Sequence, residues 1–174
     1  MKALLVIDML NDFIAEKGVL YCGQTARKII PRIKKLIQEF LSSKNPVIYL
    51  CDSHDPDDEE FKLFPAHCVK GSWGAEVVEE LKPEKDNPFV YVIEKTRFSG
   101  FYKTELEELL KKLGIDELWL TGVCTSICVM DTAKDAYERG FKLIVVKDGV
   151  ADFDPEAHEF ALKRMEKIYG AKVI

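Results

Sequence analysis

The sequence predicts an α/β protein of three layers, in which helices cover both faces of a doubly wound, mostly parallel sheet of six strands. Two observations predict this class. Short apolar runs rich in β-branched residues recur along the chain, and amphipathic helical patterns separate most of them. Strands that alternate with helices are typical of a parallel sheet that is covered on both faces. No proline-rich, glycine/serine-rich or single-sign charged stretch marks a linker, so we expect a single domain over residues 1–174.

The predicted elements follow in order along the chain. Six runs are candidate strands: residues 3–7, 46–50, 89–93, 117–120, 142–146 and 171–174. Four stretches have helical spacing of their apolar residues: 25–43, 104–113, 125–139 and 155–169. In the first of these helices, Pro31 is compatible with a helix only in the first turn.

Composition excludes several classes of partner. The formal net charge of -5 provides no basic surface for a nucleic acid and no polybasic segment for an acidic membrane. The first apolar run is five residues long and ends at Asp8, too short for a membrane span or a signal-peptide core, so we expect a cytoplasmic protein.

The five cysteines lack paired zinc-knuckle spacing and favour free thiols over a disulfide framework. A small-molecule partner is expected, and the sequence leaves the oligomeric state, a homo-oligomer included, open.

Polar residues follow four of the predicted strands. They are Asp8, Asp52 with His54, Lys95, and the segment that begins at Thr121. Ligands of open parallel sheets bind beyond the carboxyl ends of the strands, where the strand order reverses. Neither GxGxxG nor GxxxxGK follows the first strand, so a nucleotide site has little support. The strand ends therefore predict where the functional site lies.

Cys128 is a candidate nucleophile. It lies about one turn into a predicted helix, where the helix dipole and free N–H groups favour a thiolate and an oxyanion. Asp8 is placed to accept its proton, and Lys95 to offset the charge of both. Taken singly, each has a structural alternative: a small buried hydrophobe for Cys128, a turn cap for Asp8 and a solvated charge for Lys95.

A second group has the side chains of a metal centre. Asp52 and His54 form an Asp-x-His pair at a strand end, and His67 follows in FPAHC. Mixed oxygen and nitrogen ligands suit zinc, manganese or iron. Glu60 lies between the histidines, but it belongs to an acidic run, DPDDEE, of the kind that usually forms a solvated surface. His158 lies in a charged helix, where we expect it to be solvated.

Five ordered blocks together carry a resemblance: IDMLNDFI, DSH, FPAHCVKGSWG, EKTRFSGF and TGVCTSICVMDTAKDAYERG. They cover nearly the whole chain, which resembles the nicotinamidase/pyrazinamidase branch of the isochorismatase-like cysteine hydrolases. The resemblance implies an isochorismatase-like fold and hydrolysis of nicotinamide or pyrazinamide, through a thioester, to the acid and ammonia. It also implies one divalent metal ion, zinc in the first instance, that orients the pyridine ring of an aromatic carboxamide.

The resemblance also assigns residues. Asp8, Lys95 and Cys128 match the catalytic triad. The backbone N–H groups of Cys124 and Cys128 match the oxyanion hole, after a cis bond between Val123 and Cys124. Asp52, His54 and His67 match the metal ligands, with Glu60 as the best match for a fourth, and Phe13, Phe64 and Tyr102 match the aromatic ring contacts.

Two departures from the family pattern leave the fine substrate preference open, and alternative functions remain. The family commonly has alanine at Cys124 and a Thr-Asp pair where this chain has Thr125 and Ser126. One alternative is a metal-free amidohydrolase that acts on carbamoyl or ureido compounds. The presence of three candidate metal ligands, Asp52, His54 and His67, disfavours it. A vinyl-ether hydrolase is disfavoured by Cys128, and a non-catalytic α/β binding domain is the alternative from a different class.

Overall fold

The structure is a computed structural model that describes residues 1–174. A central sheet of six strands has the order β3-β2-β1-β4-β5-β6, and every neighbouring pair is parallel. The strands are β1 Lys2–Ile7, β2 Val47–Asp52, β3 Val90–Lys95, β4 Glu117–Val123, β5 Lys142–Ala151 and β6 Lys172–Val173. The predicted fold class is confirmed, with a wholly parallel sheet.

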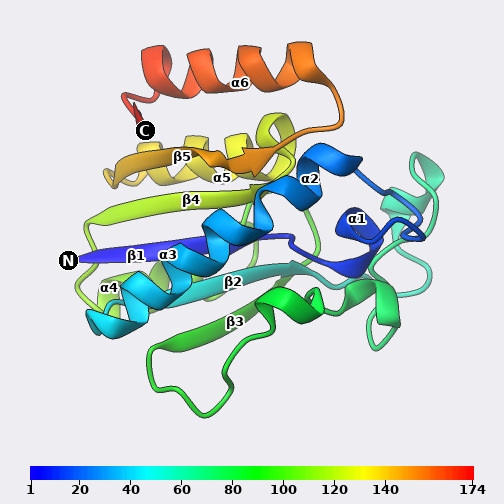
Figure 1. Ribbon diagram of the computed structural model, residues 1–174, viewed down its shortest axis with the longest axis horizontal. Helices are drawn as coiled ribbons and strands as arrows, with labels where there is room; N and C mark the ends of the chain where they lie inside the picture. The colour runs from blue at the N-terminus through cyan, green and yellow to red at the C-terminus, as the bar shows by residue number, and fades with distance from the viewer.

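Helices cover both faces of this sheet (Figure 1). They are α1 Asn11–Ile14, α2 Gln24–Lys28, α3 Ile30–Ser42, α4 Leu106–Lys112, α5 Met130–Glu138 and α6 Pro155–Ile168. One core cluster packs apolar residues of α3 against alternate β1 residues such as Leu4 and Val6, and the other packs α4, α5 and α6 against Leu5 and Ile7. Successive side chains of β1 therefore pack into different cores, as expected for a strand buried on both faces.

Two predicted helices are interrupted. The stretch from residue 25 to 43 forms α2 and α3, which meet at Ile29, because Pro31 has no N–H to donate and is accommodated only in the first turn of α3. The stretch from residue 125 to 139 begins as a π-helical turn, Thr125–Val129, before α5 starts at Met130. Such turns are frequent at functional sites.

The topology predicts where a ligand would bind. The chain passes from β1 to β2 and β3 on one side and then returns to β4 on the other side of β1. The strand order therefore reverses between β1 and β4, and the crevice lies beyond their carboxyl ends. Gly122 lets the two strands approach, since it has φ of 110° and a Cβ there would lie 1.9 Å from the carbonyl oxygen of Ile7.

None of the helices combines the length and the apolar character that a bilayer-spanning helix needs.

Candidate active site and metal centre

Asp8 follows β1 directly and is held in a rare backbone conformation. Its φ is 51°, in the left-handed region, and its side chain is buried. Non-glycine residues in this region are uncommon and cluster at functional sites. The backbone N–H of Asp52 donates to Asp8 Oδ1 at 2.9 Å, so the ends of β1 and β2 are joined through the Asp8 carboxylate.

Lys95, the last residue of β3, is buried between two carboxylates. Its Nζ lies 2.8 Å from Asp8 Oδ2, forms an ion pair with Asp52 Oδ1 and donates to the Arg97 carbonyl at 3.0 Å. Burial lowers the pKa of Lys95, but the charges of Asp52 and Asp8 outweigh burial and raise it well above its ordinary value. The buried amine is therefore an ammonium group that holds both carboxylates.

Cys128 comes to this pair from the π-helical turn after β4. Its Sγ lies 3.6 Å from Lys95 Nζ, and within 4.8 Å of carboxylate oxygens of Asp8 and Asp52. The structure thus brings the three predicted triad residues together from β1, β3 and β4. Burial, with the two carboxylates adding to it, raises the pKa of Cys128 well above the ordinary value, although Lys95 opposes this. The resting side chain of Cys128 is therefore a thiol, not the thiolate that its position in the helix alone predicts. A thiol needs a base to remove its proton before it can act as a nucleophile.

Asp8 has the properties of that base. Burial first, and then the charge of Asp52, raise its pKa to about 6, against the opposing effect of Lys95. Its Oδ2 is close to Lys95 but accepts no well-aligned hydrogen bond. A carboxylate oxygen with a free lone pair beside the Cys128 thiol is suited to receive the thiol proton.

The turn that carries Cys128 also presents backbone donors. The Val123–Cys124 peptide bond is cis, as predicted. The N–H of Cys124 donates to no acceptor in the protein, as an oxyanion-hole donor requires. Asp152 anchors the turn, because its Oδ2 accepts from both the N–H and the hydroxyl of Ser126, at 2.8 and 2.7 Å.

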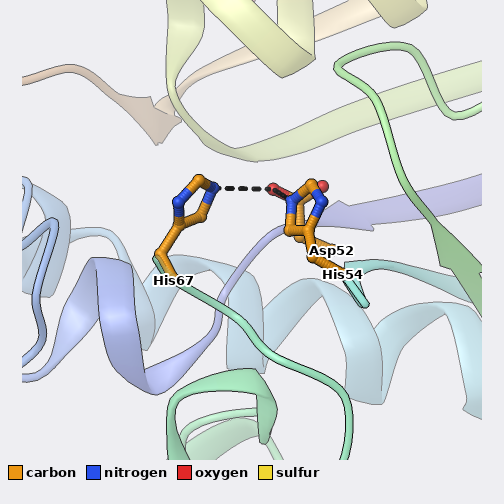
Figure 2. A group of neighbouring side chains, drawn as sticks. All are labelled: Asp52, His54 and His67. Carbon is orange, nitrogen blue, oxygen red and sulfur yellow. Dashed lines mark ion pairs between the residues drawn. The ribbon is translucent and has the colours of Figure 1, made fainter. Parts of the chain in front are cut away.

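Asp52 also belongs to a second group of four side chains that converge on one point. His54 Nε2 lies 3.5 Å from Asp52 Oδ2 and 3.9 Å from Glu60 Oε2, while His67 Nε2 lies 4.0 Å from Asp52 Oδ2 and 3.9 Å from Glu60 Oε1. Figure 2 shows His67 facing the Asp52 carboxylate, with a dashed line marking the pair that they form. Glu60 is not a solvated surface residue, since its side chain is only 9% exposed.

The Nδ1 atoms of both histidines already have hydrogen-bond partners. His54 Nδ1 lies 3.0 Å from Asp58 Oδ2, and His67 Nδ1 lies 2.8 Å from the Pro65 carbonyl. Each Nδ1 therefore carries a hydrogen, which leaves each Nε2 facing the shared point, the arrangement of metal-ligating histidines. His54 Nε2 and Glu60 Oε2 are buried without a hydrogen-bond partner, which is costly unless a cation pairs with them.

These residues fit a divalent metal. Tetrahedral ligands with bonds of about 2.1 Å lie roughly 3.4 Å apart, close to the observed separations of 3.5 to 4.0 Å. Burial lowers the pKa of His54, but the carboxylates of Asp52 and Asp58 raise it to about 9 overall, so this point favours a positive charge, either a proton on His54 or a metal ion that replaces it. Asp58 was missed by the sequence analysis; it contacts His54 and accepts from Arg97 at 3.0 and 3.1 Å.

A cavity with room for water-sized molecules over about 60 Å³ connects the two groups. Phe13 and Phe64 line it, but Tyr102 does not, because its side chain is 45% exposed and packs beside Lys103. The apolar wall is completed by residues that were not predicted from the sequence as cavity residues: Leu20, Phe98, Val123 and Ile127. Phe98 stands within the EKTRFSGF block, three residues after Lys95, which is the one signal that could have found it.

His158 differs from the expectation of a solvated side chain, because it is half-buried. Its Nδ1 lies 2.8 Å from the hydroxyl of the fully buried Thr125, so it braces the start of the Cys128 turn from α6.

Comparisons with known proteins agree with this site. The isochorismatase domain family matches residues 2–174. The crystal structure of nicotinamidase/pyrazinamidase PncA from Bacillus subtilis is 44% identical, with a TM-score of 0.96 over 99% of this chain and 98% of that one. The pyrazinamidase of Pyrococcus horikoshii in complex with zinc is 32% identical, with a TM-score of 0.91 over 99% of this chain and 98% of that one. N-carbamoylsarcosine amidase from Thermoplasma acidophilum is 40% identical, with a TM-score of 0.89 over 99% and 94%.

Fold, site and family match together define a hydrolase with a buried cysteine in the turn that follows a central parallel strand. The chain belongs to the isochorismatase family, and its solved relatives include nicotinamidases and pyrazinamidases.

Proposed function

We propose that the protein hydrolyses nicotinamide, or the similar ring amide pyrazinamide, to the carboxylic acid and ammonia. One observation carries this proposal: the Asp8, Lys95 and Cys128 group and a candidate metal group lie at one cavity and share Asp52. Eight of the twelve residues that line the cavity are hydrophobic, which suits a flat aromatic ring better than a ureido chain that needs many polar partners.

The residues support a two-step mechanism. Asp8 takes the proton of Cys128, and the sulfur attacks the amide carbon while the carbonyl oxygen becomes an oxyanion. The N–H groups of Cys124 and Cys128 stabilise that oxyanion. As the oxyanion collapses, the C–N bond breaks, and Asp8 gives its proton to the leaving nitrogen, which departs as ammonia. Asp8 then takes a proton from water, whose oxygen attacks the thioester, the C–S bond breaks and the acid is released, and Asp8 passes the proton back to the Cys128 sulfur.

Lys95 keeps Asp8 ionised before the reaction, because an ammonium group 2.8 Å from the carboxylate opposes its protonation. Asp52, His54, His67 and Glu60 would hold a divalent ion, zinc by analogy with the relative crystallised with zinc, and that ion would supply an electrophilic contact for the ring nitrogen. Phe13 and Phe64, which lie beside His67, would hold the ring between the two groups. The proposed partner is thus a small aromatic carboxamide.

A panel of amides tests this proposal. Ammonia release is measured from zinc-loaded protein with nicotinamide, pyrazinamide, benzamide, N-carbamoylsarcosine and ureidoacrylate. Benzamide is the matched control, since it has the ring and the amide but no ring nitrogen. The proposal expects the largest kcat/KM for nicotinamide or pyrazinamide. The 40% identity with N-carbamoylsarcosine amidase makes the carbamoyl compound the second candidate, and faster release from it would overturn the assignment.

A further inference from the structure

Two thiols that the proposed mechanism does not use lie in contact. The Sγ atoms of Cys22 and Cys124 are 3.4 Å apart, although the residues are 102 positions apart in the sequence. Both side chains are buried, with 4% and 8% of their surface exposed. Cys22 lies in the loop between α1 and α2, and Cys124 lies directly after β4. The pair therefore bridges the loop that carries Leu20, a cavity residue, and the turn that carries Cys128.

We propose that Cys22 and Cys124 are a modification site: a peroxide oxidises them to a disulfide that reversibly inactivates the hydrolase. The inactivation rests on the proposed function, whereas the disulfide itself does not. No other pair among the five cysteines has a sulfur–sulfur contact within hydrogen-bonding distance. The site is therefore specific to these two thiols.

A peroxide has a route to the pair. Cys124 lines the same cavity as Cys128, and hydrogen peroxide is little larger than water. The Cys124 sulfur attacks one peroxide oxygen, the O–O bond breaks, and a sulfenic acid and one water form. The Cys22 sulfur then attacks the Cys124 sulfur, the S–S bond forms, the S–O bond breaks and a second water leaves. Two thiols and one hydrogen peroxide thus give one disulfide and two waters.

The reaction is expected to be slow. The hydrogen bond with Cys22, together with burial, raises the pKa of Cys124 above that of an ordinary thiol, so little of the reactive thiolate is present. Disulfide formation in proteins takes seconds to hours, and this pair belongs at the slow end of that range.

The cross-link would disturb the catalytic turn. A disulfide has an S–S bond of about 2.05 Å, so the two sulfurs must approach by roughly 1.3 Å from their separation of 3.4 Å. The main chain at Cys124 holds the turn, because its carbonyl accepts from the N–H groups of Ile127 and Val129 on either side of Cys128. A misplacement of about 1 Å in an active site can reduce the rate roughly a hundredfold. Oxidation should therefore lower the hydrolysis rate by at least tenfold.

Mass spectrometry tests the disulfide without any assay of activity. The Cys128→Ala protein is treated with hydrogen peroxide, blocked with N-ethylmaleimide under denaturing conditions and digested with trypsin without reduction. Cys22 lies in the peptide GVLYCGQTAR, and Cys124 becomes the one thiol of LGIDELWLTGVCTSIAVMDTAK. The proposal expects these two peptides to be linked and dithiothreitol to separate them. Absence of the linked pair while either thiol is oxidised to its acids would overturn it.

Activity tests the inactivation. Cys22→Ser should hydrolyse amide at the wild-type rate before oxidation, because Cys22 does not line the cavity. Under peroxide the wild type should lose at least tenfold in rate and regain it with dithiothreitol, while Cys22→Ser should lose far less over the same time. Cys51→Ser, which removes another buried cysteine, should respond like the wild type. Equal loss in Cys22→Ser and the wild type would assign the inhibition to Cys128 and overturn the regulatory role.

Discussion

Asp52 pairs with Lys95 through Oδ1, while its Oδ2 lies 3.5 Å from His54 Nε2. One carboxylate thus belongs both to the cluster around Cys128 and to the candidate metal centre. A cation at the histidines would withdraw negative charge from Asp52 and, through Asp52, change the electrostatics of Asp8 and Lys95. The two halves of the site are therefore expected to be coupled.

We predict that His54→Ala loses bound metal, because it removes the buried Nε2 that has no other partner. Elemental analysis of the purified protein checks this. His158→Ala is the control, since His158 contacts Thr125 and not the metal group. Wild-type metal content in His54→Ala would show that the metal lies elsewhere.

Glu60→Gln is predicted to weaken metal retention by about 10- to 100-fold, while helix content stays unchanged. Glu60 lies 3.9 Å from both histidines, and an amide oxygen is a weaker ligand than a carboxylate oxygen. A chelator competition assay measures the change. Glu59→Gln is the matched control, because the Glu59 side chain is 73% exposed. Equal retention in the two variants would remove Glu60 from the ligand set.

The pH dependence of kcat/KM should have an acidic limb. Asp8 must be ionised to take the Cys128 proton, and burial with the charge of Asp52 raises its pKa to about 6. The rate should therefore be high above this pH and fall as the pH decreases through it. A bound cation that neutralises part of Asp52 would move the midpoint to lower pH. With metal content verified at each pH, a rate that stays constant down to the ordinary carboxyl range would exclude Asp8 as the base.

Gly122→Ala should destabilise the fold strongly. A Cβ there would lie 1.9 Å from the Ile7 carbonyl oxygen and would push β4 away from β1. Gly114→Ala is the matched control: it has a similar positive φ of 66° but no atom near its Cβ, and it should cost about 1 kcal/mol, or roughly 2–4 °C in Tm. Thermal unfolding that shows equal losses for the two variants would contradict the close approach of β1 and β4.

Much of the site was predictable because parallel strands place their carboxyl ends together. Asp8, Asp52, Lys95 and Cys128 each follow or end a strand, so the predicted sheet alone brings them near one another. The cis bond between Val123 and Cys124 was predicted from the family resemblance alone, because no local sequence pattern predicts it.

Other features depend on tertiary contacts that the sequence does not show. The contact of Cys22 with Cys124 joins residues 102 positions apart, and Asp58 looked like one of several acidic surface residues. Tyr102 shares a segment with Phe98, but the backbone directs only Phe98 to the cavity. The break at Ile29 and the π-helical turn at Thr125 were missed because helical periodicity continues across both.

Ammonia release from nicotinamide by the wild type, Cys128→Ala and Cys124→Ala, at equal metal content, tests the central claim most directly. Cys128 is predicted to be the nucleophile, whereas Cys124 contributes its backbone N–H. Cys128→Ala should therefore release ammonia no faster than buffer while still binding nicotinamide, and Cys124→Ala should keep most of the wild-type rate. An active Cys128→Ala enzyme, or an inactive and correctly folded Cys124→Ala enzyme, would contradict the account.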